Sequence, residues 1–441
     1  MIDLLEEKKG YIASFAQFEQ SSHAREHSWL DGIRQDSIAR FDELGFPTTR
    51  QEEWRFTNIA PLAKIPFKPA DSIPSSLTIS DISRYTVCEA RCTQLVFLNG
   101  FYSDSLSTVK FLPKGVKIIS LAKALETDRA VLEPLLTESS SCQSNAFAAL
   151  NTAFMTDGAF VHIPHGIALK DPIHLLFLST RQTDPAISVP RSIIVVESES
   201  QASIVESYAS LDKGVYFTNS ITELYVGAGG QVDHYKLQRE SDDAFHVATV
   251  RVLQERDSTY SSHSLSLGGS LVRSNLNVVL NGTGADCQLN GLYVTRRQQH
   301  VDNHTTIDHA KPHCASRELY KGILDDSSSA VFNGRIVVRK DAQKSNARQT
   351  NKNLLLSKDA AINTTPQFEI FADDVKCTHG ATIGQLNEEE LFYLRSRGID
   401  RDAARTLLTY AFASELLTAI KIKPIQCQID LVLLNRLSRA S

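Results

Sequence analysis

Between about Leu95 and Gly384 the chain consists of short runs of β-type sequence, and no long helical stretch interrupts them after about residue 155. Each run has four to seven residues, is rich in β-branched side chains and follows the previous one after 10–15 residues. Clear examples are 192–197, 202–207, 221–226 and 247–252. This pattern predicts a mainly β core and leaves two architectures open, a sandwich of two sheets and a β-solenoid.

Weak internal similarity favours the solenoid. The segment 280–291 (LNGTGADCQLNG) resembles 324–334 (LDDSSSAVFNG), and each precedes a strand-like run. The two segments start 44 residues apart, which fits coils of a parallel β-helix better than the hairpins of a sandwich. The few Asn-Gly turn signals also lack equal flanking strands. We therefore expect a parallel β-helix core.

Helical periodicity marks both ends of the chain. We expect an N-terminal helical region and linker over 1–80, with Pro-rich and Ser-rich sequence over 64–80, and a β-helix core over 81–384. An Ala- and Leu-rich stretch predicts a helical interruption near 120–155. Residues 385–441 predict a C-terminal helical domain, in which Asn387 can cap one helix and Gly398 can end it.

Composition excludes several classes of function. A formal net charge of -5 gives no reason to expect nucleic acid as a partner, and the apolar runs are too short to span a membrane. The N-terminus lacks the features of a secretory signal. Seven scattered cysteines without a C-x-x-C pair suit reduced thiols. Together these features lead us to expect a cytoplasmic protein.

No motif for autonomous catalysis is present. The chain lacks the G-x-x-x-x-G-K-[ST] loop of an ATPase and the G-x-S-x-G elbow of a hydrolase. No flavin-binding motif is visible, and Gly227-Ala-Gly-Gly230 lacks the spacing of a dinucleotide loop. A self-contained nucleotide-dependent enzyme is therefore not indicated.

Two segments could bind metal. Cys377 and His379 stand two residues apart in DDVKCTHGATIG, so a β-strand would present sulfur and nitrogen on one face. Two ligands of this kind suit iron, zinc or copper but do not complete a four-ligand site. The second segment, 300–314, contains four histidines, a cysteine and two aspartates, although its spacing matches no familiar zinc motif. Its histidines equally suit hydrogen-bonding positions in solenoid turns.

Longer stretches resemble a known family. The segments 368–384 (FEIFADDVKCTHGATIG) and 391–398 (LFYLRSRG) closely resemble the SufD family of the SUF iron–sulfur cluster assembly machine. The resemblance extends to 349–356, 303–309 and 53–57, and therefore covers nearly the whole chain in order. The paralogous SufB proteins are not expected to share the Lys-Cys-x-His-Gly stretch.

The resemblance implies a right-handed parallel β-helix between N-terminal and C-terminal helical regions. It implies a non-catalytic scaffold that pairs with a SufB-type paralogue through the β-helix, and it assigns His379, with Cys377 adjacent, to a transient iron–sulfur cluster site shared between the two proteins. A SufC-type ATPase, which would bind the nucleotide in place of this chain, is expected to dock on the C-terminal helices. The residues expected at that docking surface are Leu391, Leu394, Leu407, Leu408 and Phe412.

Other interpretations stay open at this stage. A β-helix can carry a carbohydrate-active enzyme, although no clear carboxylate constellation is visible. The 300–314 segment could form the centre of a self-contained metalloprotein. A SufB-type subunit or a homodimer in isolation are closer alternatives.

Overall fold

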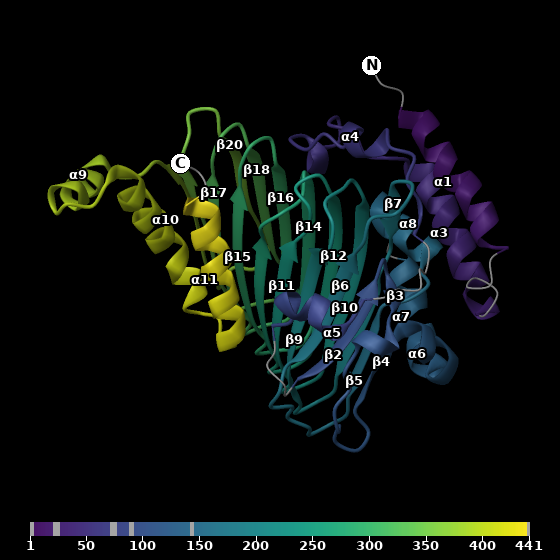
Figure 1. The fold of residues 1–441 in the computed structure, drawn as a ribbon. Helices are drawn as coiled ribbons and strands as arrows, with labels where there is room; N and C mark the ends of the chain where they lie inside the picture. Colours follow the sequence, from purple (N-terminus) through teal and green to yellow (C-terminus); the bar gives the residue numbers. More distant parts are fainter. Residues whose placement is uncertain (1–3, 21–26, 71–76, 88–91, 142–144, 439–441) are drawn as a thin grey trace.

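The computed structural model describes residues 4–20, 27–70, 77–87, 92–141 and 145–438. Its centre is a β-solenoid of about 8 turns formed by two sheets, with helices toward both ends of the chain (Figure 1). The prediction of a mainly β chain with a parallel β-helix core and flanking helical regions is confirmed.

Successive strands of the solenoid alternate between the two sheets. From one edge to the other, the first sheet contains β20 (Ala361–Ile370), β18 (Ser329–Val338), β16 (His300–His309), β14 (Leu271–Leu280), β12 (Phe245–Gln254), β10 (Phe217–Val226), β8 (Arg191–Val196), β5 (Ala159–Ile163) and β4 (Lys117–Ser120), with β7 (Ala186–Ser188) pairing both β10 and β1 (Lys68–Pro69). The second contains β21 (Lys376–Gly384), β19 (Asn346–Leu355), β17 (Ala315–Leu324), β15 (Asp286–Thr295), β13 (Thr259–Ser266), β11 (Gln231–Arg239), β9 (Gln201–Ser210), β6 (Ile173–Ser179), β2 (Thr93–Leu98) and β3 (Phe101–Tyr102).

Strand register sets the length of one coil. Asp286 pairs with Ala315, Ala315 with Asn346 and Asn346 with Lys376, all in parallel, so one coil takes about 30 residues. The 44-residue similarity seen in the sequence therefore does not mark equivalent positions of two coils. Its matched Asn-Gly pairs fall on β15 of the second sheet and β18 of the first. The solenoid prediction was right, but this repeat is not its period.

The core lies in the lumen, which is the space between the inner faces of the two sheets. Alternate residues of each strand point inward, and a continuous apolar cluster runs from Leu95 and Phe97 to Ala347 and Ala372. Equivalent side chains of neighbouring coils stack along this cluster: the ring centroids of Phe97 and Phe177, and those of Phe177 and Tyr208, lie 4.8 Å apart. At the N-terminal end, antiparallel pairs β4–β5 and β2–β3 close the parallel stack.

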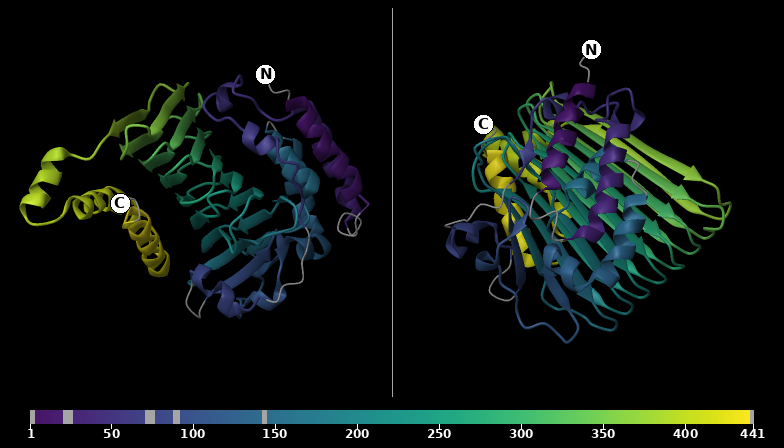
Figure 2. Two further views of the ribbon diagram at one scale, coloured as in Figure 1. Left: turned by 45° about the horizontal axis from the view of Figure 1, so that its top comes forward. Right: turned by 90° about the vertical axis from the view of Figure 1, so that its right-hand side faces the viewer.

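N-terminal helices cover part of the outer face of the first sheet (Figure 2). They are α1 (Leu4–Phe18), α3 (Asp31–Leu44), α4 (Ala60–Ala63) and, from the interruption of the β pattern, α6 (Leu121–Thr127), α7 (Arg129–Ser141) and α8 (Ala146–Phe154), together with the short turns η1 (Ser28–Leu30) and η2 (Glu52–Trp54). Phe41 and Phe147 pack with Phe217 and Phe245 of the sheet. Trp54 is buried beneath the Arg273 guanidinium, whose carbon lies 3.8 Å from the ring centroid.

Between the N-terminal helices and β2, the expected linker over 64–80 contains strand β1, and its residues 71–76 lie outside the described residues. The remaining short elements are α5 (Ile79–Ile82), η3 (Ser83–Tyr85) and η4 (Asp104–Leu106).

The C-terminal helices are α9 (Glu388–Ser396), α10 (Arg401–Leu417) and α11 (Lys423–Ser438). The Asn387 side chain caps α9, and Gly398 follows that helix with a φ of 85°. Leu416 of α10 and Ile429 of α11 pack with Leu292 of the second sheet. The α9 segment extends away from the solenoid (Figure 2).

Two expectations drawn from composition concern the described residues. No described helix is both long and apolar enough to cross a bilayer. Cys287, Cys314, Cys377 and Cys427 are free. Cys92, however, is disulfide-bonded, so the expectation of reduced thiols is wrong at this position.

Candidate functional site

Cys377 and His379 lie on β21, the last strand of the second sheet. Because they are two residues apart on one strand, both side chains are on the same face. Cys377 is half-buried and packs against the apolar cluster of the lumen, which shows that this face is the inner one. The expectation that a strand presents both groups together therefore agrees with the structure. They stand at the open end of the lumen, formed by β20 and β21 and called here the lumen mouth.

His379 is exposed to solvent but held by an aromatic contact across the lumen mouth. Its ring centroid lies 4.7 Å from that of Phe368, which is on β20 of the opposite sheet, and the two ring planes are inclined by 34°. Burial raises the pKa of the Cys377 thiol above its ordinary value, so the sulfur stays protonated near neutral pH until a bound metal displaces the proton.

Behind the mouth, the residues that pair with the His379 position on the preceding coils lie in the buried lumen. His379 pairs with Gln349 of β19, and Gln349 pairs with Glu318 of β17. Gln349 is 1% exposed, and its Nε2 donates a hydrogen bond of 2.7 Å to Glu318 Oε2. Burial raises the pKa of Glu318 to about 7, although the hydrogen bond from Gln349 acts in the opposite direction.

A glycine of the facing sheet makes room for this pair. A Cβ atom at Gly334 would lie 2.1 Å from Gln349 Nε2, so a side chain at this position would displace the Gln349 amide from the place it occupies. Gln349 and Glu318 are buried behind the mouth, so His379 is the exposed member of this row.

The lumen mouth provides only part of a metal coordination shell. Among the described ranges, no three His, Cys, Asp or Glu side chains are grouped closely enough to hold a metal ion. Iron in a sulfide cluster is bound by four ligands, so Cys377 and His379 need donors from outside this chain or from the cluster itself. Among the described residues, the lumen mouth thus holds two candidate ligands, which do not complete a four-ligand site.

The lumen mouth also has unpaired strand edges. Within the part of the chain that the structure describes, β20 and β21 each pair with a strand on one side only. Ile370, Phe371 and Ile383 beside them are 41%, 62% and 51% exposed. Exposed backbone edges together with exposed apolar side chains are typical of a surface that pairs with another chain.

The 300–314 segment does not form a single cluster. His304 faces outward, with its Nε2 3.0 Å from Asp302 Oδ1, and His300 Nε2 is 2.9 Å from Thr57 Oγ1. His309 faces inward, where its ring nitrogens bond to Ser345 and Ser316. The strand alternation thus separates these side chains onto two faces, and the histidines act in hydrogen-bond networks that hold the coils together.

The residues expected to dock an ATPase differ in exposure. Leu391 is buried, whereas Leu394 and Leu408 are half-buried, and Leu407 is 50% exposed. Phe412 packs against the solenoid, where its carbonyl accepts a 2.7 Å hydrogen bond from Lys321 Nζ. Part of the apolar face of α10 therefore packs against the solenoid, and the rest is exposed to solvent.

Several side chains of the C-terminal helices and of the lumen mouth could not be identified from the sequence. On α9, Phe392 and Tyr393 are 72% and 58% exposed, yet they fall outside the expected stripe. Glu318 and Gln349 were not recognised as neighbours of His379 because the length of a coil was unknown. Once the period of about 30 residues is known, the three residues stand one coil apart.

Comparison with known proteins finds relatives that align with most of the chain. Residues 177–412 match a family model described as the SufBD core domain of SUF-system FeS cluster assembly, and residues 5–175 match the SufBD N-terminal region. An iron–sulfur cluster assembly SufBD family protein of Synechocystis is 39% identical over 409 residues, covering 91% of this chain and 90% of the relative. Escherichia coli SufD is 30% identical, with 90% of each chain covered, and Bacillus subtilis SufD is 25% identical, with 95% of each covered.

Proposed function

This chain belongs to the SufBD family of iron–sulfur cluster assembly proteins, and we propose that it acts there as a non-catalytic scaffold subunit of the SufD type. In this proposal it contributes His379, assisted by Cys377, to a transient cluster site shared with a SufB-type partner. The observation that carries the proposal is the incomplete ligand pair at the lumen mouth. An imidazole and a thiol face the lumen on the last strand of the second sheet, where the edges of β20 and β21 have no partner strand among the described residues.

The nascent cluster is the cargo of this site. His379 is accessible and oriented by Phe368, so its imidazole is available as an iron ligand without rearrangement of the strand. Cys377 lies deeper, and its raised pKa means that iron must displace a proton before the sulfur binds. We therefore assign the first contact with the cluster to His379.

Pairing with the partner is assigned to the β20 and β21 edges. A second solenoid placed end to end would continue both ladders and cover Ile370, Phe371 and Ile383. Docking of a SufC-type ATPase is assigned to the C-terminal helices, through the exposed Phe392, Tyr393 and Leu407, with Leu394 and Leu408 at the edge of the surface. Leu391 is buried and Phe412 packs against the solenoid, so both hold these helices in place.

The test of the cluster site is His379→Ala in the reconstituted complex. We expect the complex to assemble normally and cluster formation, measured by the visible absorption of the iron–sulfur chromophore, to fall below about a tenth of the wild-type yield, since one iron ligand is lost. Thr378→Ala is the matched control, because Thr378 is exposed on the opposite face of the same strand. A full yield from His379→Ala contradicts the assigned role.

The ATPase surface is tested by Leu407→Glu. This residue is 50% exposed, so the charge should leave the fold intact while weakening ATPase binding at least about tenfold by burying an unpaired carboxylate in the interface. Leu431→Glu, at a 62% exposed position of α11, is the control. Circular dichroism must show equal helicity in both variants. Equal binding by both variants to the ATPase contradicts the assignment.

A further inference from the structure

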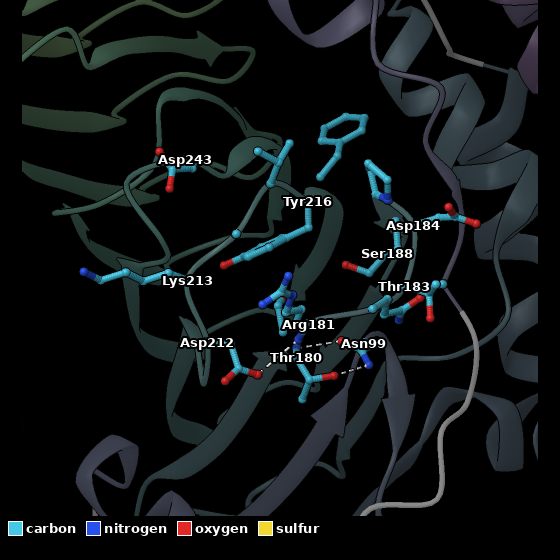
Figure 3. Close-up of a pocket in the computed structure, with 18 residues that line it drawn as sticks. Asn99, Thr180, Arg181, Thr183, Asp184, Ser188, Asp212, Lys213, Tyr216 and Asp243 are labelled. Carbon is cyan, nitrogen blue, oxygen red and sulfur yellow. Dashed lines mark hydrogen bonds between the residues drawn. The ribbon is translucent and has the colours of Figure 1, made fainter.

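A second cavity lies far from the lumen mouth, among the loops that join the two sheets near the N-terminal end of the solenoid (Figure 3). Its volume is about 380 Å³, within the range of small-molecule pockets. The walls are the loop after β6, the loop between β9 and β10, and the ends of β1 and β2. Several coils separate it from β21, so it is not part of the proposed cluster site.

One positively charged side chain of this cavity has no acceptor among the described residues. The guanidinium of Arg181 forms neither a hydrogen bond nor an ion pair within the described residues, and it projects into the cavity between Tyr216 and Ser188 (Figure 3).

The carboxylates around the cavity are engaged elsewhere or stand apart from Arg181. Asp184 forms a 2.6 Å ion pair with Lys68, and Asp212 Oδ2 accepts from the backbone N–H of Arg181 at 3.2 Å. Asp243 lies on the opposite wall, and Lys213 extends away from Arg181 (Figure 3). Arg181 is therefore the cation that faces the cavity.

The position of Arg181 is fixed by its backbone. Thr180, the preceding residue, is held by a reciprocal pair of 2.8 Å hydrogen bonds with Asn99: its backbone N–H donates to Asn99 Oδ1, and its hydroxyl accepts from Asn99 Nδ2. With Asp212 bonded to the N–H of Arg181, both residues are tied to neighbouring loops. The guanidinium thus extends from an anchored backbone, which lowers the entropy cost of binding.

We propose that this cavity binds a small molecule carrying an oxyanion, either a phosphate or a carboxylate, through Arg181. A guanidinium binds such groups through two parallel hydrogen bonds. The hydroxyls of Ser188 and Thr183 line the same cavity and can bond to the remaining polar groups of the ligand. The volume leaves space for an organic portion beyond the oxyanion.

The experiment is calorimetric titration of the full chain, at constant ionic strength, with inorganic phosphate in one arm and citrate in the other. We expect saturable binding at one site per chain in at least one arm, and the responding arm identifies the oxyanion. Arg181→Gln should weaken this binding at least about tenfold. Arg181 is exposed, so this variant should unfold at the wild-type temperature.

Lys213→Gln is the matched control, since it removes the same charge from the same cavity rim and should change the affinity less than about twofold. Three results would overturn the proposal: no saturable binding in either arm, unchanged binding by Arg181→Gln, or equal weakening by Lys213→Gln, which would indicate a general charge effect only. None of these measurements uses iron, sulfide or a partner protein. Their outcome is therefore independent of the proposed cluster site.

Discussion

At the scale of single residues, Glu318 is an acid placed in the lumen without a counter-charge. Within the described residues no cation forms an ion pair with it, and burial raises its pKa from 4.5 to about 7. A carboxyl group whose pKa is higher in the folded than in the unfolded protein stabilises the fold only while it is protonated. Its contribution is complete below pH 4.5 and is lost as the pH rises through 7.

Glu318→Gln should therefore stabilise the protein in a pH-dependent manner. The variant and the wild type should have similar free energies of unfolding near pH 4.5, and the variant should be more stable by on the order of 2–3 kcal/mol at pH 8. Denaturant unfolding at a series of pH values measures this difference. The control is Glu369→Gln on the solvent side of β20, which should show only a small change. A constant difference across the pH range would refute the argument.

The sequence alone could identify the Cys377 and His379 pair, because alternation along a strand places residues two apart on one face. It could not place Gln349 or Glu318 behind them, since neighbours in a solenoid are separated by a coil length that no local pattern reveals. The 300–314 segment was predictable in this respect, because alternation along a strand places His304 and His309 on opposite faces, as the structure has them.

At the scale of elements, the neighbouring strands β15 and β17 each place a tyrosine opposite a glycine of the other strand. Tyr320 of β17 covers Gly291 of β15, and Tyr293 of β15 covers Gly322 of β17. A Cβ atom at Gly322 would lie 2.3 Å from Tyr293 Cε2 and 2.5 Å from Asn353 Oδ1. Tyr293 itself is fixed by a 2.6 Å hydrogen bond from its hydroxyl to Asn353 Oδ1. The two tyrosine rings can pack closely in the second sheet only because glycine stands opposite each of them.

Gly322→Ala should therefore destabilise the fold by roughly 1–3 kcal/mol, because the ring of Tyr293 has no free space into which to move. Gly384→Ala is the matched control on β21, where an added Cβ would contact nothing within 4 Å. Thermal unfolding of both variants provides the comparison. Equal midpoints for the two would show that the lumen adjusts around the methyl group.

Strands were predictable where β-branched residues dominate, as in β8 and β12. The polar sequences of β16 (HVDNHTTIDH) and β19 (NARQTNKNLL) lack this β-branched pattern, yet each forms a strand of ten residues. In a solenoid each inner strand bonds to a neighbour on both sides, so the backbone ladder holds polar sequence in strand conformation. Buried amides such as Asn351 and Asn353 then bond to one another, with Asn353 Nδ2 2.6 Å from Asn351 Oδ1. The helix caps at Asn387 and Asp400 could be predicted from the sequence, because capping depends only on residues close together in the chain.

At the scale of the whole molecule, the two ends of the solenoid are unequal. Antiparallel strands and helices close the N-terminal end, whereas β20 and β21 leave the other end open within the described residues. Pro366 on β20 has no N–H to donate, which suits an edge position. The open end is therefore the face to which the proposed pairing with another solenoid is assigned.

Ile383→Lys should reduce this pairing. Ile383 is 51% exposed at the open end, and a lysine there would bury a charge in the interface, so we expect affinity for a SufB-type partner to fall at least about tenfold with an unchanged unfolding temperature. The control is Thr382→Lys, an exposed neighbour on the outer face of β21. Sedimentation velocity of the mixtures measures the complex. Pairing that survives Ile383→Lys would place the interface elsewhere.

The open end has a consequence for folding as well as for binding. A solenoid is a linear array in which each coil gains its stability from the coils on either side, and a terminal coil has only one such neighbour. The coil that contains His379 is therefore the first to fray, and its amide hydrogens exchange sooner than those of central coils. Under the proposed function, a docked partner supplies the missing neighbour. Association at this end should then slow the exchange of the amide hydrogens of this coil, so partner binding and local stability are coupled.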